Sequence, residues 1–285
     1  MKPDFIVCGF QKCGTTSLHD ALSEHPEVCM SKPKEPDYFT LHWDEDVSWY
    51  HDRFGHCADE SLVGEVSVSY SLYGERTPRR IKDLIPDVQI IFVVRDPVER
   101  AFSSYWHGVK VGTINHEKGK FFDLISGRKS VPDYWHPRYD AGELILKNGL
   151  YHKTVLDYQK HFGNENVKVL LFEELFSRGI KEISEFLGIK EGYISEEHSN
   201  KGRYLQSKKV YRFYKSISCF VKKYAPSNIE SNMSFISNYL RPFLFRSSEK
   251  PEFPKRAKSF LIDYYRKPNK NLYDILEKDL SHWQS

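Results

Sequence analysis

The chain has 285 residues, of which 40% are hydrophobic and 15% aromatic, so it can form a sizeable core and is not a disordered chain. Charged residues make up 28%, but the formal net charge at pH 7 is only +3, which by itself gives no reason to expect nucleic-acid binding. We expect a single folded domain over residues 1–285 and no nucleic-acid partner.

The five cysteines are odd in number, and their spacing matches no zinc pattern. They are Cys8, Cys13, Cys29, Cys57 and Cys219. A domain of this size does not need disulfides, so we expect all of them to be reduced. Residues 1–4 show no signal-peptide pattern, and the longest clean apolar run, Val88–Val94, is too short to cross a bilayer. We therefore expect a cytoplasmic protein without a transmembrane segment.

Strands alternate with helices over much of the chain. Apolar, often β-branched runs predict strands, and apolar residues at helical spacing predict helices. The predicted strands are Phe5–Gly9, Leu62–Val66, Val88–Val94 and Val167–Phe172. The predicted helices are Thr15–Ser23, one that Asp96 caps and Pro97 opens, Tyr151–Phe162 and Glu174–Leu187. Residues 32–59 predict a long structured loop with short helices, and the alternation favours a parallel sheet covered on both faces.

Basic residues dominate a segment nearer the C-terminus. No acidic residue occurs between His198 and Ile229, although this stretch holds eight lysines and arginines. We expect a basic helical segment at about 205–245, most regular over Leu205–Tyr224, and a C-terminal helix pair at about 255–283, broken at Pro268. The basic face suits a sulfated or acidic glycan, an ordinary solvated helix, or peripheral contact with an anionic membrane.

A turn rich in glycine and hydroxyl side chains, Gly9–Leu18, joins the first strand to the first helix. Such a turn directs backbone N–H groups to one place at the positive end of a helix dipole, which suits a phosphate. It differs from a Walker A loop because Lys12 lies inside it and Thr15 directly follows Gly14. No predicted strand ends in a Walker B aspartate, so we expect no required metal. The expected fold is a P-loop-like, three-layer α/β fold with a central, mainly parallel sheet flanked by helices.

Lys12–Leu18 resembles the 5′-phosphosulfate loop of the sulfotransferases that use PAPS (3′-phosphoadenosine 5′-phosphosulfate), and it is most similar to the heparan sulfate sulfotransferases and their bacterial relatives. The resemblance implies that PAPS is the sulfuryl donor and that PAP (3′-phosphoadenosine 5′-phosphate) is a product. It also implies a donor-binding loop that consists of Gln11, Lys12, Cys13, Gly14, Thr15, Thr16 and Ser17.

A second segment, Ile90–Tyr105, carries the same resemblance. It contains a buried strand, Arg95 at the end of that strand and Ser103 in the following helix. The resemblance implies that Arg95 and Ser103 hold the 3′-phosphate, for which the planar donor fork of arginine is well suited. Taken alone, Arg95 would suit an ion pair with Asp96 or Glu99, and Ser103 an exposed position on a helix.

A third segment is shorter and less specific. It matches the stretch that closes over the cofactor in the heparan sulfate enzymes, and its residues are Lys201, Gly202 and Arg203. Two cations and a glycine that permits close backbone approach suit that role.

We assign the catalytic roles to Lys12 and Glu35. Lys12 is expected to stabilise charge on the leaving oxygen and the sulfuryl group. Glu35 lies in a segment that looks like the family stretch in which a glutamate precedes two aromatics, and it is the expected base. The alternative interpretation of Glu35 is a loop carboxylate paired with Lys32 or Lys34.

One lysine of the heparan sulfate enzymes is missing. Their Glu-Lys-Thr-Pro segment matches Glu65–Tyr70, in which Val66 replaces the lysine. Either Lys12 acts alone or another group reaches the site. The candidates are Arg76, His42, His51 and His107.

The resemblance predicts an enzyme that transfers a sulfuryl group by direct in-line attack to a hydroxyl or amine, with a carbohydrate or glycolipid as the expected acceptor. The tryptophans that suit stacking on sugar rings, or filling the core, include Trp43, Trp49, Trp106 and Trp135. Two other functions remain open: a P-loop-type kinase or NTPase, and a non-catalytic protein that binds polyanions. The sequence specifies neither the acceptor nor the oligomeric state.

Overall fold

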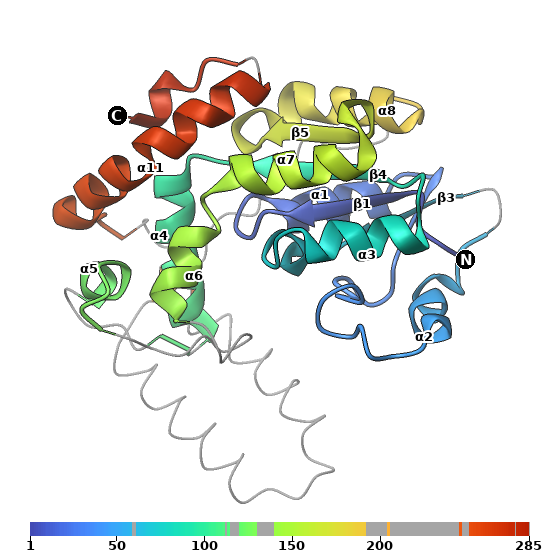
Figure 1. Ribbon diagram of the computed structural model, residues 1–285, viewed down its shortest axis with the longest axis horizontal. Coiled ribbons are helices and arrows are strands. Elements are labelled where there is room, and N and C mark those ends of the chain that lie inside the picture. The colour runs from blue at the N-terminus through green and yellow to red at the C-terminus, as the bar shows by residue number, and fades with distance from the viewer. Residues whose placement is uncertain are drawn as a thin grey trace, which may run out of the picture.

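Parallel strands form the centre of the structure, which is a computed structural model (Figure 1). The strands are β1 Phe5–Gly9, β2 Val28–Met30, β3 Leu62–Val66, β4 Gln89–Val94 and β5 Val167–Leu171. They form one five-stranded sheet in the order β2-β3-β1-β4-β5, and each neighbouring pair is parallel. The expected central sheet is therefore confirmed.

The structure describes residues 1–58, 61–111, 113–114, 120–129, 140–191, 204–205, 245–246, 251–276 and 278–284. Within these ranges, no helix is both long enough and apolar enough to cross a membrane. Trp135 and the Lys201–Arg203 segment lie outside the described residues.

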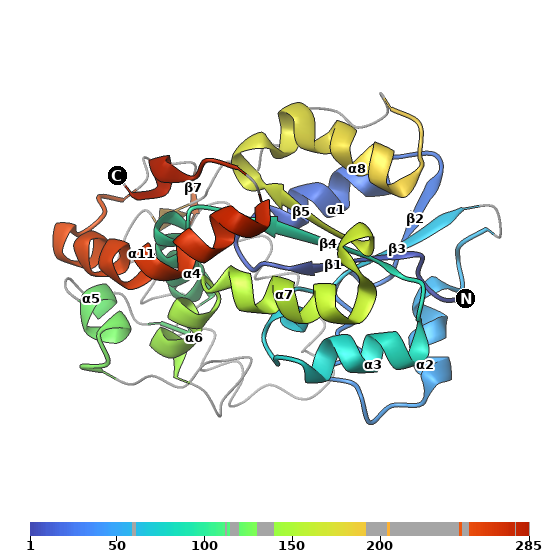
Figure 2. The same ribbon diagram turned by 45° about the horizontal axis from the view of Figure 1, so that its top comes forward.

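Helices cover both faces of the sheet, as Figure 2 shows. One face carries α1 Thr15–Ser23 and α8 Ile180–Leu187, and the other carries α3 Arg76–Leu84 and α7 Tyr151–Phe162. The three-layer α/β fold is thus confirmed. The faces are opposite because the β1–α1–β2 and β3–α3–β4 crossovers run in opposite directions along the sheet, and such crossovers are right-handed.

Most predicted elements agree with the structure at or near their bounds, and the differences have local causes. Strand β2 was not predicted because it is three residues long and lies at the sheet edge. The predicted helix Glu174–Leu187 begins irregularly, with η4 Phe172–Glu174 and the π-helical turn η5 Leu175–Gly179, before α8. The predicted loop contains α2 Val47–His51 and η1 Asp52–Phe54, as expected. Two further short turns are η2 Val68–Ser71 and η3 Asn164–Asn166.

A second, smaller core lies beside the sheet. It is formed by α4 Pro97–Val111, α5 Lys120–Ile125, α6 Ala141–Lys147 and α11 Lys255–Leu276. The predicted cap of α4 is confirmed, because the Val98 N–H donates to Asp96 Oδ1 at 2.9 Å. Phe102 stacks on Phe253 with ring centroids 4.2 Å apart. Phe102 also shares this core with Ala257 and Leu261, so α4 packs against the C-terminal helix.

The predicted break at Pro268 is wrong, because α11 continues through it. A proline inside a helix removes one backbone hydrogen bond and favours a kink. Packing on both sides opposes the break: Tyr265 and Leu272 are buried, and the Tyr265 hydroxyl donates to Leu146 O at 2.8 Å. The second C-terminal element is the short turn η7 Ser281–Gln284.

The predicted basic segment at about 205–245 lies almost entirely outside the described residues. Its two ends are described as strands, β6 Tyr204–Leu205 and β7 Phe245–Arg246, which pair antiparallel. Those end residues are therefore not helical.

The expectation that all cysteines are reduced is wrong for two of them. Cys29 and Cys57 form a disulfide with a Cα–Cα distance of 5.7 Å. Cys8 and Cys13 are free and buried, and Cys219 lies outside the described residues. Sequence spacing did not reveal the pair because the fold brings β2 beside the loop that follows η1.

Candidate functional site

The two predicted phosphate-binding segments meet at one edge of the sheet. Strands β1 and β4 are parallel neighbours, so their carboxyl ends lie side by side. The Gly9–Gly14 loop follows β1, and Arg95 follows β4. Strands β2 and β3 lie on one side of β1 in the sheet, and β4 and β5 lie on the other side. The strand order therefore reverses between β1 and β4, and open α/β sheets bind ligands at such a point.

The loop after β1 has the shape of an anion cradle. Gly14 has a left-handed φ of 87°, and a Cβ placed there would lie 2.7 Å from the Phe172 ring, so this position requires glycine. Helix α1 begins at the next residue, and the first N–H groups of a helix have no carbonyl of their own to bind. The loop therefore aims donors and the positive end of the α1 dipole at the edge of the sheet.

The side chains of the loop divide between core and surface. Thr15 and Ser17 are buried, whereas Thr16 is exposed. Cys13 is a buried residue of the loop, with Sγ 3.8 Å from the Tyr151 hydroxyl, and its N–H donates to Phe10 O at 3.2 Å. Cys13 therefore contributes to the shape of the loop.

Lys12 is the centre of a positively charged cluster. The pKa of its ammonium falls from 10.5 to about 8, mainly because of burial and also because of the nearby positive charges of Lys110, Arg95 and Lys34. Like charges gathered round a half-buried ammonium are unfavourable unless an anion joins them. The residues at this edge therefore fit the phosphate and sulfuryl groups of a donor such as PAPS.

Helix α4 lies directly against the loop. Lys12 Nζ is 3.4 Å from His107 Nδ1, and the Ser104 hydroxyl lies 3.3 Å from Gln11 Oε1. Ser103, half-buried, is four residues before His107 and so lies on the same face of the helix. The α4 face that carries Ser103 and His107 therefore belongs to the site.

Arg95 is fixed in place but keeps free donor capacity. Its Nη2 lies 3.8 Å from Glu99 Oε2, and its guanidinium lies over the Phe172 ring, 4.7 Å from the centroid. The Tyr151 hydroxyl donates to the Arg95 carbonyl at 2.8 Å. The ion pair with Glu99 considered from sequence is thus present. Among the described residues it is one long contact, which leaves most of the five guanidinium N–H donors for a ligand.

Glu35 lies beside the phosphate loop and is paired with a lysine. Lys34 Nζ donates to Glu35 Oε1 at 2.8 Å and to Thr16 Oγ1 at 3.2 Å. The ion pair considered as an alternative for Glu35 is therefore present. The same lysine joins the segment that carries Glu35 to the first turn of α1, which places the carboxylate at the edge of the cradle.

Asp37 is a site carboxylate that the sequence analysis missed. The pKa of Asp37 is raised to about 6, mainly by burial and in smaller part by the nearby charge of Glu35. The Ser69 hydroxyl donates to Asp37 Oδ1 at 2.6 Å, which acts in the opposite direction. Asp37 stands two residues after Glu35, but its burial depends on Ser69 and so was not visible in the local sequence.

A buried carboxyl, Glu65 at the end of β3, supports the segment that carries Glu35. Glu65 accepts hydrogen bonds from Ser67 Oγ at 2.7 Å and from the Tyr50 hydroxyl. Ser67 Oγ in turn accepts the Asp37 N–H at 3.1 Å. Burial raises the pKa of Glu65 to about 7. Glu65 thus anchors the Asp37 backbone through Ser67.

Val66 occupies the position of the missing family lysine, and its side chain is fully buried in the core. Arg76 lies over the Tyr73 ring at 5.6 Å. His42 stacks on Trp49 at 4.7 Å, and desolvation lowers the pKa of His51. Of the candidates considered from sequence, His107 is the one that contacts Lys12.

Comparison with known proteins places this architecture in a family. A family model described as "Sulfotransferase domain" matches residues 2–237, and the chain belongs to this family. The chain is 28% identical over 207 residues to the human protein named heparan sulfate glucosamine 3-O-sulfotransferase 3B1, covering 69% of this chain and 48% of that protein. It is 27% identical over 257 residues to the mouse bifunctional heparan sulfate N-deacetylase/N-sulfotransferase 3, covering 84% of this chain and 28% of that protein. The chain therefore spans less than half of the length of either relative.

A solved structure supports the fold. The crystal structure of a sulfotransferase from Alicyclobacillus acidocaldarius superposes with a TM-score of 0.69 at 24% sequence identity, over 100% of both chains. The similarity to heparan sulfate sulfotransferases and to a bacterial relative, expected from the sequence, is confirmed.

Replacing Glu65 by glutamine should remove a pH-dependent loss of stability. The fold raises the pKa of this carboxyl from 4.5 to about 7, so between these values the folded state binds more protons than the unfolded state. The free energy of unfolding therefore falls as the pH rises through this range, by at most about 1.4 kcal/mol per pH unit, and levels off above it. Urea unfolding of the wild type and Glu65→Gln across this range measures the difference.

Glu75→Gln is the matched control. Glu75 is exposed and pairs with Lys160 at 3.2 Å, which holds the pKa of its carboxyl below the ordinary value. The stability that this pair contributes is present above the ordinary pKa and is lost as the pH falls, which is the opposite direction. Parallel stability curves for the wild type and Glu65→Gln would contradict the assignment of a raised pKa to Glu65.

Proposed function

We propose that this chain transfers a sulfuryl group from PAPS to a hydroxyl or amine of a carbohydrate acceptor by direct in-line displacement. The observation that carries the proposal is the cluster of Lys12, Lys34, Arg95 and Lys110 at the carboxyl edge of β1 and β4. A half-buried ammonium whose pKa is lowered by burial and by other cations needs an anion, and a phosphosulfate supplies one. Membership of the sulfotransferase family is consistent with this chemistry.

The residues of the site divide the work of holding the donor. The backbone of the loop from Gln11 to Ser17 and the start of α1 would hold the 5′-phosphosulfate. Arg95 and Ser103 would hold the 3′-phosphate, as the family resemblance implies. Lys201, Gly202 and Arg203 keep their proposed role of closing over the donor, although they lie outside the described residues.

Two lysines would stabilise the charge that develops during transfer. Lys12 lies in the loop itself, where its ammonium meets the phosphate on the leaving side. Lys34 donates to both Glu35 and Thr16, so it places a second cation between the expected base and the cradle. We propose that Lys34 supplies the charge that the family lysine, replaced here by Val66, supplies in the heparan sulfate enzymes.

Glu35 is the proposed base, and Asp37 is its nearest rival. Glu35 stands beside the cradle, where it can accept the proton of the attacking hydroxyl or amine. The raised pKa of Asp37, about 6, makes it a stronger base than an ordinary aspartate, but the Ser69 hydroxyl already donates to its Oδ1. His107 contacts Lys12 and is therefore better placed to orient that lysine than to deprotonate the acceptor.

A carbohydrate acceptor is supported by the names of the relatives, which act on heparan sulfate. Among the described tryptophans named above, Trp43 is the exposed one, and Arg80 lies 4.4 Å from the centroid of its ring. Trp43 follows the Glu35 segment closely in the chain and so suits stacking on a sugar near the base. The cytoplasmic location, the single-domain organisation of residues 1–285 and independence from metal ions stay predictions.

Calorimetric titration with PAP, with a chelator and without Mg²⁺, tests the donor site. PAP should bind tightly and ATP weakly, and Arg95→Ala should weaken PAP binding on the order of 10- to 100-fold, because charge-assisted hydrogen bonds to the phosphate are lost. Arg79→Ala, which removes an exposed arginine from α3, is the control and should bind PAP like the wild type. In a parallel titration with Mg²⁺ and no chelator, a preference for Mg-ATP over PAP would contradict the proposal and favour a kinase or NTPase. PAP binding without any transfer would favour a non-catalytic anion-binding protein.

Sulfuryl transfer by Glu35→Gln and Asp37→Asn tests the base. Glu35→Gln should lower kcat by about 10²- to 10⁴-fold, the usual contribution of a general base, while Asp37→Asn should change it by less than about tenfold. Rates are measured from labelled PAPS with a heparan-type oligosaccharide at saturating donor. A Glu35→Gln rate within about threefold of the wild type would remove Glu35 from the mechanism.

A further inference from the structure

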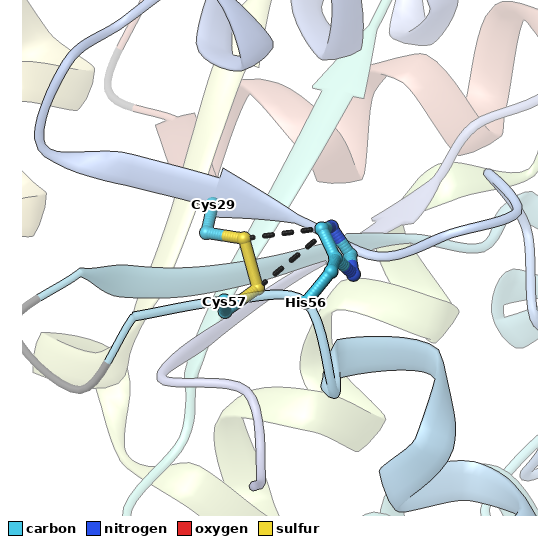
Figure 3. A group of neighbouring side chains, drawn as sticks. All are labelled: Cys29, His56 and Cys57. Carbon is cyan, nitrogen blue, oxygen red and sulfur yellow. Dashed lines mark hydrogen bonds between the residues drawn. A yellow bond between two sulfur atoms is a disulfide. The ribbon is translucent and has the colours of Figure 1, made fainter.

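The disulfide closes the loop that carries the proposed base. Cys29 lies in β2 at the sheet edge, and Cys57 follows η1, so the cross-link spans a sequence separation of 28 residues (Figure 3). Glu35 and Asp37 both lie between the two cysteines. A covalent bond at the base of this segment therefore restricts the positions that the two carboxylates can take.

The disulfide is open to reagents in solution. Cys29 and Cys57 are only half-buried, and His56 beside them is exposed, whereas the free thiols of Cys8 and Cys13 are fully buried. Attack on a disulfide requires that a thiolate reach one of its sulfurs. Among the described cysteines, this pair is therefore the one placed for exchange.

His56 is placed to assist that exchange. Its Nε2 lies 3.6 Å from Cys29 Sγ, 3.9 Å from Cys57 Sγ and 3.1 Å from the Met30 carbonyl, as Figure 3 illustrates for the sulfur contacts. A protonated imidazole beside a cysteine stabilises its thiolate, and a stabilised thiolate is a better leaving group. The same nitrogen serves whichever sulfur is released.

We propose that Cys29–Cys57 is a reversible thiol–disulfide exchange site for dithiol reductants, and that its reduction loosens the Glu35 segment. One thiolate of the dithiol attacks one cysteine sulfur, the S–S bond breaks, and the other cysteine leaves as a thiolate that takes a proton from His56 or water. The second thiol of the reductant then resolves the mixed disulfide. Two electrons and two protons pass to the protein, and the reductant becomes a disulfide.

Reduction is expected to loosen the segment without unfolding the domain. Other contacts remain: the Lys32 N–H donates to Arg53 O at 2.9 Å, Tyr50 is buried with its hydroxyl on Glu65, and Phe54 is buried. These contacts hold the two ends of the segment near each other. The carboxylates between them lose a covalent constraint but keep their anchor on the sheet.

Limited trypsin digestion and thiol alkylation test the exchange site without reference to catalysis. In the oxidised protein, cleavage after Lys34 or Arg53 should be slow, and reduction by dithiothreitol should accelerate it at least about fivefold. The double variant Cys29→Ser/Cys57→Ser should be cut at the fast rate in both conditions.

The rate of reduction, followed by thiol alkylation, tests the role of His56. His56→Gln should slow reduction of the disulfide by about tenfold, and His161→Gln, which changes a histidine in α7, should not. A chelator is present throughout, so that no metal ion held by the freed thiols replaces the cross-link.

Activity gives the second readout, and this part rests on the proposed function. Reduction should lower kcat/KM for sulfuryl transfer several-fold in the wild type and leave the double variant unchanged. Unpaired thiols at both positions in protein isolated without reductant, or cleavage and transfer that do not respond to reduction, would overturn the proposal. Redox-dependent cleavage in a protein that transfers no sulfuryl group would retain the exchange site and reject the proposed function.

Discussion

The structure depends on holding the Lys12 ammonium partly out of water and among other cations. Burial and the charges of Lys110, Arg95 and Lys34 all act against its protonated form, and its pKa falls to about 8. Without a bound anion, this arrangement of cations does not stabilise the fold. It becomes favourable when an anion enters, and the surrounding scaffold holds the cations in place for that event. The Tyr151 hydroxyl donates to the Arg95 carbonyl, and Ser104 of α4 contacts Gln11 of the loop.

A second constraint acts on the segment beside the cradle. The segment that carries Glu35 has left-handed φ values of 60° at Glu35 and 52° at Asp37, which non-glycine residues rarely adopt. Such a conformation persists only when its surroundings fix it. Glu65 does so through Ser67, and the Cys29–Cys57 disulfide closes the segment. The proposed catalytic geometry thus depends on a buried carboxyl and a cross-link, neither of which is a proposed substrate ligand.

The sequence was sufficient to predict the features of the site that neighbouring residues along the chain determine. The Gly9–Leu18 turn, the strand that ends at Arg95 and the cap at Asp96 were all predicted, because periodicity and local turn chemistry determine them. The roles of Glu65 and Asp37 and the disulfide were not, because each depends on contacts across the sheet edge that spacing does not encode. The helix through Pro268 was missed for a related reason: tertiary packing outweighs a local helix-breaking preference.

Proton uptake on binding PAP tests the central claim most directly. Calorimetric titration near pH 8 in buffers of different ionisation enthalpy reports the protons exchanged per PAP bound. Lys12, with a pKa of about 8 in the free protein, should take up about half a proton as the bound anion holds it charged. Lys12→Arg stays charged at this pH and should bind PAP without that uptake. The same uptake in Lys12→Arg, or none in the wild type, would contradict a lysine poised for an anion.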